Sequence, residues 1–142
     1  MTRRLFGAAT AACVSLGVLG LALASAGAGD AETPTIKSVM QKLNGKGAKA
    51  ESARLRTALA KPSPDWKTVQ TSTKEFAALS ASLAKSEPPR GDAESWKKFA
   101  EAYASQCQAL DDAAGKKSVA DTKAAFQKVS MSCMGCHKSH KK

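Results

Sequence analysis

The chain has 142 residues, of which 43% are hydrophobic and 5% aromatic, and its 22 basic and 12 acidic side chains give a formal charge of +10. This length is enough for one domain. The lysines are spread among acids and no glycine-rich or basic-aromatic motif occurs, so we do not expect a nucleic-acid partner. A lysine-rich surface that attracts acidic partners is the favoured interpretation.

The first residues predict a signal for export. Two arginines near the start precede an uncharged run that ends at Asp30, and small residues allow cleavage after Ala24 or after Ala28. We therefore divide the chain into a signal peptide, 1–28, and a mature domain, 29–142, that is periplasmic or otherwise exported. The alternative is an uncleaved membrane anchor, but alanine and glycine make the run only weakly hydrophobic. No membrane association is expected after cleavage.

Four helical segments follow the signal, and each has a recognisable start. Their predicted ranges are 33–60, 64–85, 92–114 and 118–139. A cap residue followed by proline is typical of a helix start, and Asp and Ser are good caps on their own. The predicted starts are Thr33-Pro34, Ser63-Pro64, Asp92 and Ser118. Short connections link the four segments.

Apolar residues recur every three or four positions in these segments, which is the spacing of one helix face. The spacing loses phase at Gly45, where we predict a kink or a break. It is most regular in the last segment, in the row Val119, Thr122, Phe126, Val129, Cys133, Cys136 and His140. The pattern predicts an all-α protein, an antiparallel up-down-up-down four-helix bundle. With few aromatic residues its core would be thin, so either the helices approach closely or a large apolar group fills the space.

The last segment contains the string Cys133-Met134-Gly135-Cys136-His137. Cys-x-x-Cys-His is the attachment motif of c-type haem, in which two thiols add to the haem vinyl groups and the histidine binds the iron. On a helix this spacing places both sulfurs and the imidazole on one face. We therefore predict one covalent haem c as the cofactor, attached near the C-terminus of the last helix.

Other uses of these residues stay open. Cys133, Cys136, His137 and His140 could supply four zinc ligands, although neighbouring side chains on a helix diverge too much for a tetrahedral set. A thioredoxin-like pair would need a βαβ setting, which is missing. The mature chain has a third cysteine, Cys107, and an odd count argues against a pure disulfide framework. We interpret Cys107 as a buried core residue, with an intermolecular disulfide as the alternative.

The signal, the helical segments, the CMGCH string and the basic Lys141 together resemble the class II cytochromes c, the cytochrome c prime family, over residues 33–142. The resemblance implies that Cys133 and Cys136 form the thioethers and that His137 is the proximal iron ligand. It also implies that a residue of the first helix covers the opposite face of the haem. Homodimers are common in the family.

Two residues of the first segment compete for that distal position. Met40 is the only methionine there, whereas the family's usual count of seven from Ile36 gives Leu43. With Met40 on the iron, the resemblance implies a six-coordinate, single-electron carrier with acidic redox partners. With an open site over Leu43, it implies a five-coordinate protein that binds NO or CO. Met40 as an ordinary core residue remains an alternative.

A third interpretation, from a different class, is a zinc- or disulfide-stabilised helical interaction protein. We do not expect an enzyme, since no nucleophile–base set or pair of carboxylates can be placed around a cleft.

Overall fold

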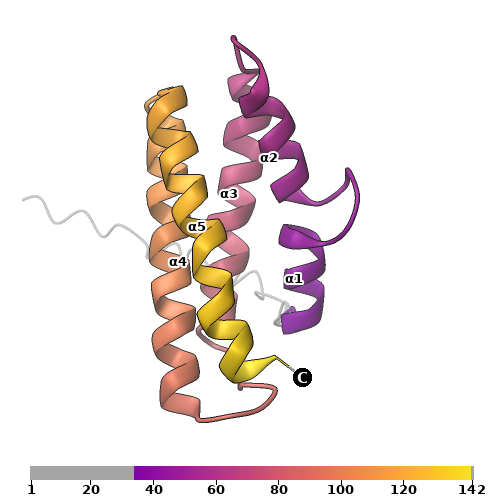
Figure 1. Cartoon of the computed structure of the whole chain (residues 1–142), viewed down its shortest axis with the longest axis vertical. Coiled ribbons are helices and arrows are strands. Elements are labelled where there is room, and N and C mark those ends of the chain that lie inside the picture. The colour runs from indigo at the N-terminus through magenta and orange to yellow at the C-terminus, as the bar shows by residue number, and fades with distance from the viewer. Residues whose placement is uncertain (1–33, 142) are drawn as a thin grey trace, which may run out of the picture. The chain divides into compact units, whose positions relative to one another are not determined.

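The computed structural model describes residues 34–141, so the predicted signal peptide at 1–28 and the predicted cap residue Thr33 lie outside the described residues. Within that range the chain is all-helical and contains no strand, which confirms the predicted all-α class. Its helices are α1 (Ile36–Asn44), α2 (Glu51–Ala60), α3 (Trp66–Leu83), α4 (Ala93–Gly115) and α5 (Val119–His140) (Figure 1). None of the described helices has both the length and the apolar character needed to cross a membrane.

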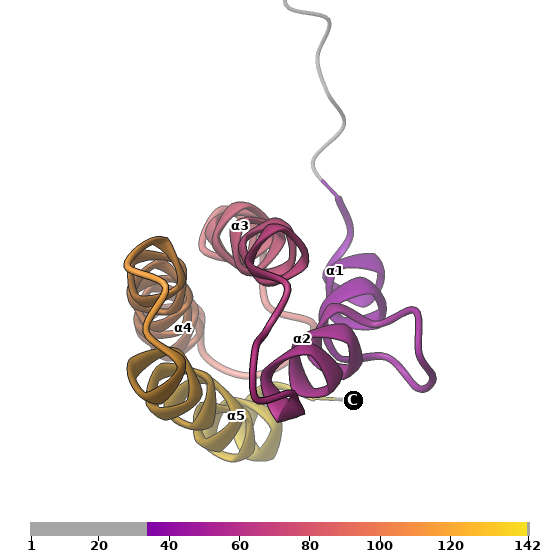
Figure 2. The same ribbon diagram turned by 90° about the horizontal axis from the view of Figure 1, so that it is seen from above.

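The helices pack mainly with their neighbours in the chain. α3 packs along α4, and α4 packs along α5, while α2 packs against α3 and the short α1 contacts both α2 and α3. Seen from above, they are arranged around a common axis (Figure 2). Over residues 34–141, α5 does not pack extensively against either α1 or α2. The side of α5 that looks toward these two helices is therefore the least closed part of the fold.

The first predicted segment, 33–60, is two helices. The predicted break at Gly45 is confirmed, because α1 ends just before it and α2 begins only at Glu51. A side chain at Gly45 would collide with the carbonyl oxygen of Gln41. Gly47, at φ +99°, adopts a left-handed conformation that glycine reaches without steric cost. The described domain therefore has five helices where the apolar spacing predicted four.

Two of the predicted helix caps are confirmed and two are wrong. Asp92 and Ser118 cap α4 and α5 through their side-chain oxygens, as predicted. The first and second predicted starts lie too early. The residues that cap α1 and α3 are Thr35 and Asp65, and each of them follows a proline. The Thr35 hydroxyl accepts the N–H of Ser38 at 3.2 Å. A side chain that can accept a backbone N–H therefore sets the start in each case, and the proline precedes the cap.

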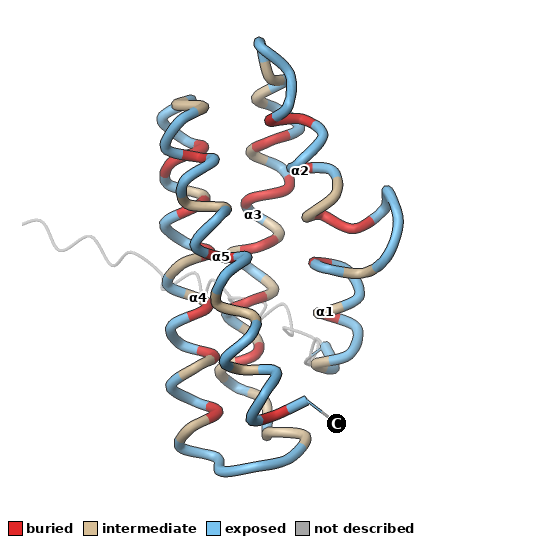
Figure 3. Tube along the Cα trace, in the orientation of Figure 1, coloured by how far each residue is buried: buried red, intermediate tan, exposed pale blue. Residues whose placement is uncertain are grey.

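The core combines apolar side chains with polar pairs between helices. Buried positions face the inside of the helix assembly in Figure 3. The Ser72 hydroxyl on α3 donates to the buried Glu51 carboxylate on α2 at 2.7 Å, and the Thr73 hydroxyl donates to Asp111 on α4 at 2.6 Å. The main apolar residues are Val39, Leu43, Leu55, Leu59, Val69, Phe76, Leu83, Trp96, Tyr103, Cys107, Leu110 and Val129. Hydrogen bonds thus join α2 to α3 and α3 to α4 within the core.

Candidate functional site

The Cys-x-x-Cys-His string occupies the last two turns of α5. Cys133 and Cys136 are free thiols and are half-buried, whereas His137 is exposed. Cys136 packs against the hydrophobic core, and the Cys133 thiol lies 3.7 Å from the carbonyl oxygen of Val129 one turn earlier. The helix thus holds both sulfurs at the edge of the core, with the imidazole next to them in solvent.

The position of His137 on α5 is defined by residues one and two turns earlier. Residues three, four and seven apart lie on nearly the same face of a helix, so Phe126, Ser130, Cys133 and His137 form one row. Phe126 and Ser130 line a pocket shared with α2. His137 therefore continues the face of α5 that looks toward α2, and its side chain is exposed.

The two distal candidates on α1 differ in their packing. Leu43 is completely buried in the core, whereas Met40 is partly buried at its edge. α1 is held by α2 and α3, and the Asn44 amide donates to the Tyr103 hydroxyl of α4 at 3.3 Å. Within residues 34–141, α1 does not pack extensively against α5. The proximal candidates are together on α5, whereas both distal candidates lie on α1.

Burial sets the protonation of the thiols. Desolvation raises the pKa of Cys133 and of Cys136, and for Cys136 the neighbouring Cys133 adds to the effect. Both thiols therefore remain protonated at neutral pH, which limits their spontaneous oxidation and metal binding.

Cys107 is the third free thiol, and its predicted burial in the core is confirmed. It lies on α4 with no exposed surface, so the folded chain offers no access for an intermolecular disulfide. Desolvation raises the pKa of Cys107 from 9.0 to about 11, and hydrogen bonds from Ser80 and Tyr103 oppose part of this rise. Cys107 is therefore a neutral core residue.

This pKa predicts a loss of stability in alkali. Unfolded Cys107 ionises near 9, but the folded thiol ionises only near 11, so its contribution is complete below pH 9 and is lost as pH rises toward 11. A shift of that size corresponds to about 3 kcal/mol. Urea unfolding should show that the free energy of unfolding declines from pH 8 to 11, and that this decline is smaller in Cys107→Ala by about that amount. Equal declines in the two proteins would contradict the assignment.

His140 has a structural role that sequence reasoning missed. Its ring is fully buried, with Nδ1 3.0 Å from the Arg90 carbonyl oxygen and Nε2 3.2 Å from the Ser95 hydroxyl. A carbonyl can only accept, so Nδ1 carries a proton and donates to Arg90, while Nε2 shares a hydrogen bond with the Ser95 hydroxyl. The ring also packs edge-on to Trp96 and Phe99, with centroids 5.5 and 5.8 Å away. The only feature of the sequence that indicated this burial is the position of His140 in the predicted inward-facing row of the last helical segment.

These contacts form a latch, by which we mean the contacts that hold the last turn of α5 to the α3–α4 connection and the start of α4. The Arg90 guanidinium donates to the carbonyl oxygen of Lys138 at 3.1 Å, which caps the end of α5. Gly91, at φ +82°, passes so close to His140 that a side chain there would touch the ring. The latch fixes the helical turn that carries His137.

The latch also bears on the zinc alternative. His140 uses both ring nitrogens in hydrogen bonds, so it is not free to join Cys133, Cys136 and His137. Over residues 34–141, no three histidine, cysteine or acidic side chains are grouped to hold a metal ion. The protein residues alone therefore do not form the tetrahedral set that this alternative requires.

Comparison of the chain with family models, with curated proteins and with solved structures found no match. The function has to be argued from the chemistry of the site itself.

Proposed function

We propose that this protein is an exported monohaem c-type cytochrome that carries single electrons. The observation on which this depends is the cluster on the last turns of α5: two free, half-buried thiols at Cys133 and Cys136, and an exposed imidazole at His137. Their spacing is that of the covalent haem motif. The signal at 1–28 would send the chain to a compartment where such cytochromes mature.

The residues present fit the cofactor. The thiols are neither paired in a disulfide nor buried beyond reach. Within residues 34–141 neither ring nitrogen of His137 has a hydrogen-bond partner, in contrast to His140. Cys133 and Cys136 would hold the haem through thioethers, and His137 would bind its iron. When bound, haem c supplies a one-electron couple whose potential depends on the axial ligands and on burial.

The polypeptide contributes position and environment. The latch at His140 keeps the His137 turn in a fixed orientation, and Phe126 and Val129 make the adjacent face of α5 apolar. In this proposal α1 and α2 together act as the first of four antiparallel helical members, and the haem occupies the side where α5 packs little against them. A covalent apolar group there would complete the four-helix bundle and its thin core.

The outer face of α5 suits an acidic redox partner. All twelve acids of the chain lie before residue 122, whereas five lysines follow it. Met131 and Met134, on either side of Cys133, are 70% and 82% exposed and are the exposed large hydrophobic residues of the described chain. Electron-transfer contacts are small and are guided by charge, so a basic surface with adaptable apolar side chains is appropriate. Homodimerisation, as in the similar family, remains a proposal.

A five-coordinate, gas-binding protein is the second candidate. It is favoured by one observation, namely that α1, which carries Met40, does not pack extensively against α5 within residues 34–141. Buried Leu43 would then leave the distal side of the iron open to NO or CO.

The experiment is to purify the chain from a host that attaches haem c and to record its mass and its oxidised spectrum. The carrier proposal expects the mass of one added haem and a low-spin spectrum with the weak far-red band of methionine–iron bonding. Met40→Ala should then become high-spin. A high-spin spectrum of the unaltered protein, with rapid CO binding after reduction, would instead support the gas-binding candidate. A colourless protein with the mass of the polypeptide alone rejects both.

A further inference from the structure

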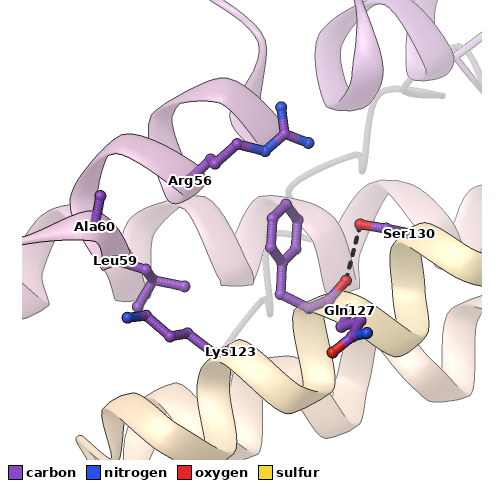
Figure 4. A pocket seen from close by; sticks show the side chains of 7 residues that line it. Arg56, Leu59, Ala60, Lys123, Gln127 and Ser130 are labelled. Carbon is purple, nitrogen blue, oxygen red and sulfur yellow. Dashed lines mark hydrogen bonds between the residues drawn. The ribbon is translucent and has the colours of Figure 1, made fainter.

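A pocket of about 310 Å³ lies between α2 and α5, away from the Cys-x-x-Cys-His turns (Figure 4). Leu59 and Ala60 of α2 and Phe126 of α5 give it an apolar wall. Arg56 and Lys123 stand at its edges, one on each helix. The volume is at the lower end of the range for small-molecule sites, about 300–1,000 Å³. A pocket of this volume can hold one end of a ligand better than a whole ligand.

The two cations have no anion near them in the described structure. Both Arg56 and Lys123 are exposed, and neither belongs to an ion pair within residues 34–141. The Arg56 guanidinium carbon lies 5.9 Å from the centre of the Phe126 ring, so the charge is held over the apolar wall. An apolar surface flanked by two cations is complementary to an amphipathic ligand that ends in carboxylates.

The pocket is continuous with the face that carries the attachment motif. Ser130, which lines the pocket, and His137 are seven residues apart, which is two turns or about 10 Å along the helix. Phe126 and Cys133 are likewise separated by seven residues in the same row. A large group fixed to Cys133 and Cys136 therefore has this pocket as its neighbour on α5.

We propose that this pocket receives the carboxylate edge of the haem, and that Arg56 and Lys123 bind its two propionate groups. The inference rests on the proposed function, since it needs a haem at Cys133 and Cys136. Binding of the propionates would also stabilise the fold, because carboxylates held by both Arg56 and Lys123 would join α2 to α5. These are the helices between which the polypeptide itself provides little packing.

The test compares Arg56→Gln, Lys123→Gln and the double variant with Lys128→Gln, which removes an exposed lysine of α5 that does not line the pocket. All should keep the mass of one haem. Losing a positive charge near the iron favours its ferric state, so the reduction potential should fall in each pocket variant and stay constant in Lys128→Gln. Urea unfolding of the haem-loaded protein should show a loss of about three- to fivefold in the folding equilibrium constant per removed cation.

A free fatty acid also combines an apolar group with a carboxylate and is the alternative ligand for this pocket. Oleate is the probe for it. Calorimetric titration of the haem-loaded protein should show no saturable binding. Oleate binding that is lost in the double variant would overturn the haem assignment of this pocket. Potentials and stabilities equal to those of Lys128→Gln, in proteins that carry haem, would overturn this inference alone. A chain without haem would reject the proposed function together with it.

Discussion

Replacing both Cys133 and Cys136 with alanine is expected to abolish covalent pigment, so that the purified chain has the mass of the polypeptide alone. Each thiol can form one thioether, and both lie half-buried on one face of α5 beside His137. Each single-cysteine variant should retain one thioether bond and therefore hold the haem less firmly than the unaltered protein. Mass spectrometry and haem staining of denaturing gels measure the result directly, because only covalent haem remains with the unfolded chain.

Cys107 provides the matched control. It is also a free cysteine, but it is buried on α4 and is not part of the motif. Cys107→Ala should therefore keep the full mass of one haem, with at most a modest loss of stability from the small cavity. Retained pigment in the double variant would contradict the proposed attachment. Loss of pigment in Cys107→Ala alone would show that the thiols had been assigned to the wrong positions.

Trp96→Ala is expected to destabilise the domain by about 3–5 kcal/mol, the range for deleting a large buried aromatic side chain. Trp96 is 5% exposed, and its indole N–H donates to the carbonyl oxygens of Leu83 and Ser86 at 3.2 and 2.7 Å. Its ring also packs edge-on to His140 in the latch. Denaturant unfolding followed by circular dichroism measures the loss, which should be accompanied by fraying of the end of α5.

Two further variants separate packing from hydrogen bonding. Trp96→Phe retains much of the apolar contact but removes the indole donor from the Ser86 carbonyl oxygen, while the Leu83 carbonyl oxygen still accepts the Ser86 N–H, so we expect a cost of about 1–2 kcal/mol. Lys97→Ala removes an exposed neighbour in a 3.9 Å pair with Glu101 and should change stability by less than about 0.5 kcal/mol. If Trp96→Ala were no more harmful than Lys97→Ala, the latch would not stabilise the fold.

Local chemistry made part of the fold predictable. Asp92 and Ser118 were identified as caps because a short side-chain acceptor before an apolar row has few other uses. The break at Gly45 followed from a loss of helical phase, and the inward row of α5 from its spacing. The motif residues were readable for the same reason, since Cys133, Cys136 and His137 are close together in the sequence as well as in space.

Contacts between distant segments were not predictable. Arg90 and His140 are 50 residues apart, and no local pattern indicates that a backbone carbonyl at one meets the ring of the other. The same applies to Arg56 over Phe126, and to the lack of extensive packing between α1 and α5 within the described residues. The caps at Thr35 and Asp65 were missed because proline was taken to follow the cap.

The latch has a consequence for maturation. Arg90 and Trp96 precede the CMGCH string in the chain, and His140 follows it. Once His140 is docked beside the Arg90 carbonyl and the Trp96 ring, the latch holds the string in a helix. If the proposed haem attachment requires this string in an extended form, folding and attachment would compete for the same residues, and a chaperone that delays docking of the final turn should raise the yield of haem-loaded protein.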